Sequence, residues 1–131
     1  MKYEKVLDVM TRGVISVHLD DSVRIVAQTL NQNKIHAVSV VTKDGEVAGV
    51  ISEIDVIGAI DEDIDTLKAE DIMCSSCIRT ITPQSPLIEA AKMMRAIKCH
   101  RLLVMGEGSK DAVAVGVLSA SDIVAEMSTK K

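Results

Sequence analysis

Two serine–aspartate pairs could bind a small molecule. A serine ends an apolar run and an aspartate follows three residues later, as Ser52 with Asp55 and as Ser119 with Asp122, where Ser121 adds a second hydroxyl. If a helix begins at the serine, its unpaired N–H groups attract an anion such as phosphate. The carboxylate can accept hydrogen bonds from a diol such as ribose. The same spacing is a capping box that needs no ligand, and both interpretations can hold in one protein.

Histidine and arginine side chains add cationic capacity near these pairs. His100 and Arg101 precede the second pair, and His36 precedes the first. Arginine binds phosphate through two N–H groups, and histidine changes charge near neutral pH. On a strand, His100 and Arg101 point in opposite directions, so one of them can be ordinary surface.

Cys74 and Cys77 form a lone CxxC motif. A structural zinc site needs four ligands, and Cys99 with His100 could complete one only if folding brought all four together. A thioredoxin-type motif opens a helix, whereas this one leads into a predicted strand. The sequence favours incidental, reduced thiols and no metal, with redox sensing and metal binding as the alternatives.

The candidate residues recur because the chain is an internal repeat. The offset between matching segments grows from 63 to 64 to 67 along the chain. The matches are Asp8-Val9-Met10 with Asp71-Ile72-Met73, Lys34-Ile35-His36 with Lys98-Cys99-His100, and Gly49 to Ser52 with Gly116 to Ser119. Two copies therefore span residues 6–60 and 69–127, joined by a predicted solvated acidic connector at 61–65.

Each copy predicts the order strand, helix, strand, strand, helix. The first copy predicts strands at 14–17, 36–41 and 47–51, with a short helix from Ser52. Apolar residues at helical spacing predict the longer helices: Val23, Val26, Ala27 and Leu30, then Leu87, Ala90, Ala91 and Met94. Ser85 and Pro86 are predicted to open the second of these helices. The second copy has a longer turn at 106–111. This order predicts an α/β fold with a small sheet in each half.

Composition excludes several function classes. The chain has 131 residues, a net charge of −4, no tryptophan or phenylalanine and one tyrosine. The lack of aromatic platforms and of a basic excess argues against nucleic-acid binding. The charge is uneven, with six basic and twelve acidic residues over 1–65, against nine and seven over 66–131. The second half is therefore expected to suit an anion better. No apolar run is long enough for a membrane span and no signal core is evident, so a cytoplasmic protein is expected.

Taken together and in order, these pieces resemble a tandem pair of CBS domains, the modules named after cystathionine beta-synthase. The resemblance covers residues 6–127. It implies two strand-helix-strand-strand-helix units packed with pseudo-two-fold symmetry. It also implies clefts between the repeats that bind adenosyl compounds such as AMP, ADP, ATP, NAD(H) or S-adenosylmethionine.

The resemblance also implies roles for individual residues. One cleft would use Asp122 for ribose, Ser119 and Ser121 for ribose or phosphate, and Met10 and Ile15 against adenine. The other would use Asp55 and Ser52, with adenine against the segment from Cys74 to Arg79, including Ile78. The strand at His100 and Arg101 is similar to one in the nucleotide-sensing gamma subunit of AMP-activated protein kinase. Those two residues, and more weakly His36, would therefore meet phosphate. The basic residue that the resemblance would place at Ala37 is absent, so the Asp122 cleft is expected to bind more tightly.

The resulting hypothesis is a regulatory module without catalysis or a required cofactor. It would bind an adenosine nucleotide, as in energy sensing, form a homodimer through its helices and control a separate, unidentified protein. The alternatives are a ligand-independent interaction scaffold and a thiol-based sensor using Cys74 and Cys77.

Overall fold

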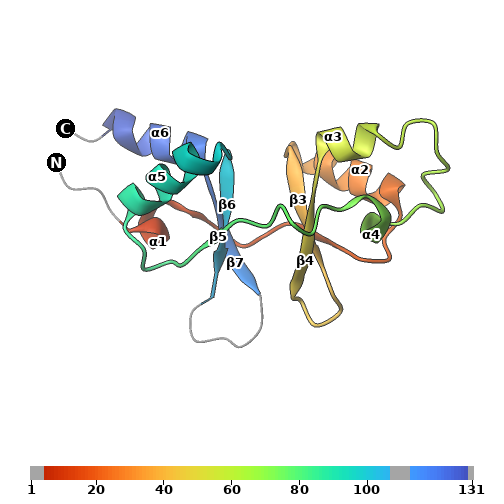
Figure 1. The fold of residues 1–131 in the computed structure, drawn as a ribbon, viewed down its shortest axis with the longest axis horizontal. Helices are drawn as coiled ribbons and strands as arrows, with labels where there is room; N and C mark the ends of the chain where they lie inside the picture. Colours follow the sequence, from red (N-terminus) through yellow and green to blue (C-terminus); the bar gives the residue numbers. More distant parts are fainter. Residues whose placement is uncertain (1–4, 107–112, 130–131) are drawn as a thin grey trace. The chain divides into compact units, whose positions relative to one another are not determined.

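The computed structural model describes residues 5–106 and 113–129 (Figure 1). These residues fold into two compact units. Unit 1 contains the chain up to Val14 together with the chain from Arg79 onward, and unit 2 contains Ile15–Ile78. The longer turn predicted at 106–111 lies, beyond Gly106, outside the described residues. None of the helices within the described ranges is long and apolar enough to cross a membrane.

Unit 2 is a three-stranded sheet with helices on one face. Its strands are β2 (Ser16–His18), β3 (Ala37–Val41) and β4 (Val47–Ser52), in the order β2-β3-β4. β2 runs parallel to β3, and β3 runs antiparallel to β4. Its helices are α2 (Val23–Asn33), α3 (Glu53–Ile57) and α4 (Ala69–Ile72). The core contains Val17, Val26, Leu30, Val38, Val40, Ile51 and Ala69.

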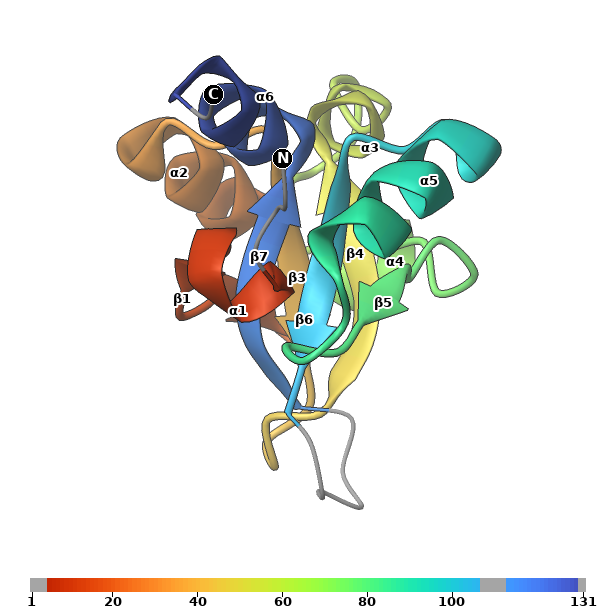
Figure 2. The same ribbon diagram turned by 90° about the vertical axis from the view of Figure 1, so that its left-hand side faces the viewer.

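Unit 1 is built in the same way around four strands. β1 (Thr11–Arg12), β5 (Thr80–Ile81), β6 (Arg101–Met105) and β7 (Ala114–Ser119) form a sheet in the order β1-β7-β6-β5. α1 (Val6–Val9), α5 (Leu87–Ile97) and α6 (Ala120–Thr129) pack on one face of it (Figure 2). The core contains Val6, Ile81, Leu87, Ala90, Met94, Leu102, Val104, Leu118 and Ile123.

Both copies contain the predicted order of strand, helix, strand, strand, helix. The first is β2, α2, β3, β4, α3 and the second is β5, α5, β6, β7, α6. The predicted first strand at 14–17 is displaced to Ser16–His18. The long helices α2 and α5 each bury three of the four apolar positions that predicted them, while Ala27 and Ala91 are half-buried. Each helix ends at a lysine in the left-handed region, Lys34 with φ 54° and Lys98 with φ 55°.

The predicted start of α5 needs a correction. The residue at its N-cap is Pro86, which cannot offer a side-chain oxygen, and Ser85 lies one position before it. The Ser85 hydroxyl instead pairs with the Thr82 hydroxyl at 2.7 Å. In α2 the corresponding cap is present, because Ser22 Oγ accepts the Ile25 N–H at 3.2 Å.

Each repeat begins with a short leading segment, residues 6–14 before β2 in the first repeat and residues 69–77 before β5 in the second. This leading segment packs in the compact unit that contains the strands of the other repeat. Thr11 of β1 pairs with Val117 of β7 in unit 1, and Cys74, after α4, pairs with Val50 of β4 in unit 2. The compact units therefore differ from the sequence repeats at 6–60 and 69–127. Repetition reveals two copies of a unit, but it does not reveal which sheet a leading segment joins.

Two glycines make room for these leading segments. A Cβ atom on Gly116 would lie 2.6 Å from the Thr11 carbonyl oxygen and 3.0 Å from Met10 Sδ. A Cβ atom on Gly49 would lie 2.7 Å from Met73 Sδ. Gly116 thus lets the Thr11 backbone and the Met10 side chain approach β7 closely, and Gly49 lets the Met73 side chain approach β4.

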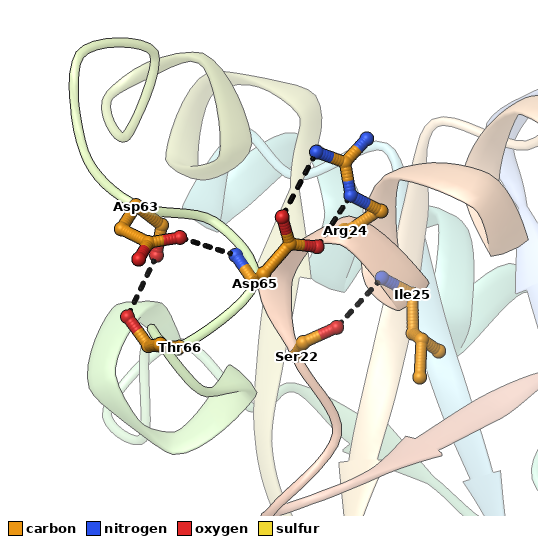
Figure 3. Close-up of polar contacts among 6 residues, drawn as sticks. All are labelled: Ser22, Arg24, Ile25, Asp63, Asp65 and Thr66. Carbon is orange, nitrogen blue, oxygen red and sulfur yellow. Dashed lines mark hydrogen bonds and ion pairs between the residues drawn. The ribbon is translucent and has the colours of Figure 1, made fainter.

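The acidic side chains of the connector are exposed to solvent, as predicted, and the connector is also bound to α2. The Arg24 guanidinium binds both carboxylate oxygens of Asp65 (Figure 3). The backbone N–H of Arg24 donates to the Ile64 carbonyl at 3.0 Å. Asp63 Oδ1 accepts the Asp65 N–H at 3.1 Å. The hydrogen bond from Arg24 lowers the pKa of Asp65 below its ordinary value. Both side chains remain exposed, so solvent screens the ion pair and the backbone contacts fix the connector.

Candidate functional site: two strand–helix corners

The second serine–aspartate pair lies where β7 ends and α6 begins. Asp122 Oδ2 accepts the Ser119 N–H at 2.9 Å, and Ser119 Oγ accepts the Asp122 N–H at 3.1 Å. This reciprocal pair is a capping box, so the capping interpretation is confirmed. The cap occupies one carboxylate oxygen of Asp122, and among the described residues Oδ1 has no hydrogen-bond donor. Both residues are half-buried. The corner can therefore cap its helix and still offer a carboxylate oxygen to a ligand.

The structure brings the predicted cationic residues to this corner. Arg101 is the direct cross-strand partner of Ser119, and the His100 carbonyl accepts the Ala120 N–H at 2.8 Å. Leu102 and Leu118 point into the core, so alternation places Arg101 and Ser119 on the opposite face of the sheet. Arg101 is half-buried, whereas His100 is exposed.

The remaining residues predicted for the Asp122 site are placed less directly. Ser121 is exposed on the first turn of α6. The Met10 side chain lies over Gly116 and packs against the core of unit 1. Ile15 belongs to unit 2. Unit 1 therefore brings Arg101, Ser119 and Asp122 together, with Met10 on the core side of the same strand.

The first pair forms the equivalent corner in unit 2, between β4 and α3. Asp55 Oδ2 accepts the Ser52 N–H at 2.9 Å and the Ser52 hydroxyl at 3.0 Å. The His36 carbonyl accepts the Glu53 N–H at 3.1 Å, as His100 does in unit 1. The His36 ring also pairs with the Glu53 carboxylate, Nδ1 to Oε1, at 3.1 Å.

A difference in charge separates the two corners. Ala37 is the cross-strand partner of Ser52, in the place that Arg101 holds beside Ser119. His36 is the residue at this corner that was predicted to meet a phosphate, and its ring is paired with the Glu53 carboxylate. The unit 1 corner is thus better suited to an anionic group.

The segment from Cys74 to Arg79 departs from two sequence-based expectations. Cys74 and Cys77 are joined in a disulfide, so the prediction of reduced thiols is wrong. Their Cα atoms are 5.5 Å apart, within the range that a disulfide spans. The segment is also divided: Ile78 ends unit 2, whereas Arg79 belongs to unit 1, where its carbonyl accepts the Leu103 N–H at 2.9 Å.

The structure does not bring together the metal ligands that the sequence left as an alternative for the cysteines. Across residues 5–106 and 113–129, no three histidine, cysteine, aspartate or glutamate side chains gather as metal ligands would. Cys99 is a free thiol in unit 1 and packs beside its core.

Sequence reasoning missed the residues that share a sheet face with the corners. In unit 1, Leu103 pairs with Val117 next to the Arg101–Ser119 pair. In unit 2, Ser39 pairs with Val50, and its hydroxyl contacts that of Ser16 at 2.6 Å. The alternation of buried and less buried residues along β6 and β7 indicates which residues share a face within one strand. The strand register is also needed to tell which residues of the two strands lie side by side.

Comparison with known proteins identifies the family. The family model described as "CBS domain" matches residues 6–62 and 69–129. The chain belongs to the CBS-domain family. The resemblance predicted from the paired motifs is therefore confirmed, and the two matches make the chain a tandem CBS pair.

Individual relatives agree with this assignment. A CBS domain-containing protein from Dictyostelium discoideum is 29% identical over 91% of this chain and 88% of its own length. The CBS domain pair of protein MJ0100, solved in complex with 5'-methylthioadenosine and S-adenosyl-L-methionine, superposes with a TM-score of 0.82. It is 22% identical over 98% of this chain and 99% of its own. CBSX2, solved in complex with AMP, also gives 0.82, at 21% identity over 98% and 99% of the two chains. These likenesses establish the CBS-pair fold.

Proposed function

We propose that this CBS pair is a regulatory module that binds an adenosine nucleotide at its strand–helix corners and controls a separate protein. The observation that carries the proposal is the unit 1 corner, where Arg101, Ser119 and Asp122 converge on one end of the sheet. Two proteins of the same fold bind adenosyl compounds, AMP in one case and 5'-methylthioadenosine with S-adenosyl-L-methionine in the other.

The corner offers complementary groups for the parts of a nucleotide. Asp122 Oδ1 can accept a ribose hydroxyl while Oδ2 keeps its hydrogen bond to the Ser119 backbone. Arg101 can donate two hydrogen bonds to a phosphate, and a protonated His100 adds positive charge. Ser121 can donate from the first turn of α6. The regulatory role requires no catalytic step.

We propose the Ser52–Asp55 corner as a second, weaker site. Ala37 supplies no charge there, and His36 is paired with Glu53. We propose that Ile78, which belongs to the same unit, also lines this site. A ligand with little or no phosphate suits it better than a triphosphate does.

The helices of unit 1 support the further proposal that two copies of this chain associate. An apolar groove of about 320 Å³ lies between α5 and α6, and Ile88, Ala91 and Met127 are among its lining residues. Lys92 and Arg95 give it a basic rim. We propose that it receives the α3 end of a second copy, described next.

The α3 end has the complementary character. Ile54, Ile57 and Ile60 are 72%, 59% and 84% exposed, so they form an apolar stripe that no other part of the described chain covers. Exposed Asp61 and Glu62 lie at the end of that stripe. A basic-rimmed groove and an acid-flanked stripe on the same chain favour a contact between copies, because opposite charges steer and orient such contacts.

A thermal-shift panel tests the binding function. The full chain is heated with AMP, ADP, ATP, NADH, S-adenosylmethionine or inorganic phosphate, with and without magnesium. A ligand present at about 100 times its dissociation constant stabilises the fold by about 2.7 kcal/mol, a rise of several degrees in melting temperature. We expect a shift with an adenosyl compound and none with phosphate. No shift with any adenosyl compound favours the alternative of a ligand-independent scaffold.

A further inference from the structure

A disulfide closes the short loop that follows α4. It joins Cys74 to Cys77 within unit 2. Cys77 is exposed, whereas Cys74 is half-buried. Thiol–disulfide exchange depends on access to the attacked sulfur, so a small thiol can reach the Cys77 side of this bond without unfolding the unit.

Cys74 is the anchored end of the loop. Its N–H donates to the Val50 carbonyl at 2.9 Å, and its carbonyl accepts the Val50 N–H at 3.1 Å. Val50 lies on β4, two residues before Ser52, where the ligand corner begins. The disulfide therefore ties Cys77 to a residue held directly beside that corner.

The tie determines the course of the chain toward the proposed ligand site. Ile78 follows Cys77 immediately and is half-buried. The disulfide restricts the conformations of the two residues between Cys74 and Cys77, so it limits where the backbone of Ile78 can lie relative to Ser52 and Asp55.

The corresponding loop of unit 1 is held by different means. Thr11 pairs with Val117 there as Cys74 pairs with Val50 in unit 2. Two residues later, the Gly13 N–H donates to the Val115 carbonyl at 2.9 Å. The stretch from Thr11 to Val14 of unit 1 contains no cysteine, so a redox change can act on the Ser52–Asp55 corner and leave the Ser119–Asp122 corner unchanged.

We propose that the Cys74–Cys77 disulfide is a reversible exchange site for a dithiol reductant and that its redox state sets the affinity of the Ser52–Asp55 corner for its adenosyl ligand. The coupling to affinity rests on the proposed function, whereas the exchange reaction does not. Oxidation holds the loop in its binding arrangement, and reduction releases it.

The exchange balances in two steps. A thiolate of the reductant attacks Cys77 Sγ, forming a mixed disulfide, and the Cys74–Cys77 bond breaks so that Cys74 leaves as a thiolate and takes up a proton. The second thiol of the reductant then attacks the reductant's first sulfur, which is bonded to Cys77 in the mixed disulfide. Cys77 leaves as a thiolate and is also protonated. Two electrons and two protons pass to the protein, and the dithiol becomes a disulfide.

Released from the tie, the loop spends only part of its time in the binding arrangement. The apparent dissociation constant rises in proportion, because it equals the intrinsic constant divided by the fraction of binding-competent protein. A fraction of about one tenth gives an affinity roughly tenfold weaker.

The experiment uses the full chain carrying Asp122→Asn, so that the Ser52–Asp55 corner reports alone, and Cys99→Ser, which removes the free thiol. Binding of AMP and, in parallel, of S-adenosylmethionine is measured by calorimetry on the oxidised protein and after treatment with dithiothreitol. Alkylation and mass spectrometry count the thiols in each state. A Cys74→Ser/Cys77→Ser variant provides a chain that cannot close the loop.

We expect two alkylated thiols only after reduction, a roughly tenfold weaker affinity in the reduced protein, and the same weak affinity in the serine variant under both conditions. Equal affinities in the oxidised and reduced proteins would overturn the coupling while leaving ligand binding intact. Two free thiols before any treatment, or a disulfide that dithiothreitol leaves intact, would overturn the exchange site. Absence of adenosyl binding in both redox states of this variant and also of the parent chain would instead refute the proposed function, and the coupling with it.

Discussion

At the scale of single residues, Ser119 and Asp122 show how one spacing can serve two purposes. The hydrogen bonds at 2.9 and 3.1 Å make the pair a helix cap, as spacing alone predicted. The ligand role could not be decided from spacing, because it depends on a third residue. Arg101 stands beside Ser119 only through the register of β6 with β7, and register is a property of paired strands.

The charge difference between the corners leads to a residue-scale prediction. Replacing Ala37 by arginine places a guanidinium beside Ser52, as Arg101 lies beside Ser119. A charge-assisted hydrogen bond contributes about 1.5–3 kcal/mol, so AMP affinity at the Ser52–Asp55 corner should rise tenfold or more. Calorimetry in an Asp122→Asn background measures it. Gln28→Arg, on an exposed position of α2, is the matched control, and an equal gain from both variants would attribute the effect to net charge alone.

At the scale of elements, local patterns predicted most of the fold. The spacing of Val23, Val26 and Leu30 predicted α2, and those residues are buried. What could not be predicted is where the leading segments pack, because β1 has two residues and the segment after α4 forms a single bridge. Such short stretches carry no periodicity, and their partners are set by space at Gly116 and Gly49.

The two glycines should therefore differ when a methyl group is added. In Gly116→Ala the new Cβ meets the Thr11 backbone carbonyl at 2.6 Å, whereas in Gly49→Ala it meets side-chain atoms of Met73, with Sδ at 2.7 Å and Cβ at 3.1 Å. Backbone cannot give way as a flexible side chain can, so Gly116→Ala should lower the free energy of unfolding by about 1–3 kcal/mol and Gly49→Ala by less. Urea unfolding of both variants measures the difference, and the reverse order would contradict this account of the leading segments.

At the scale of the whole molecule, the repeat predicted the family but not the compact units. Sequence similarity between the copies follows the order of the elements, whereas each unit combines strands of one repeat with the leading segment of the other. The two halves of the chain also differ in net charge. The half of the chain that carries α3 is acidic, and the half that carries α5 and α6 is basic.

This asymmetry gives a prediction for self-association. Lys92→Glu with Arg95→Glu reverses the rim of the groove and should shift the chain toward monomer. Adding Asp61→Lys and Glu62→Lys to the same chain should restore the dimer, because the opposite charges then face each other again. Sedimentation velocity at low and high salt measures both effects, with screening expected to weaken them. A parent chain that is monomeric, or a fourfold variant that stays monomeric, would contradict the proposed contact.

The most direct test of the central claim compares Asp122→Asn with Asp55→Asn by titration calorimetry, using the adenosyl compound that gives the largest thermal shift. Asparagine keeps an acceptor for the capping N–H but replaces the second carboxylate oxygen, so both variants should fold like the parent. We predict that Asp122→Asn abolishes the tighter binding event and that Asp55→Asn leaves it unchanged. Unchanged affinity in Asp122→Asn, with the fold intact, would show that the unit 1 corner is a helix cap alone.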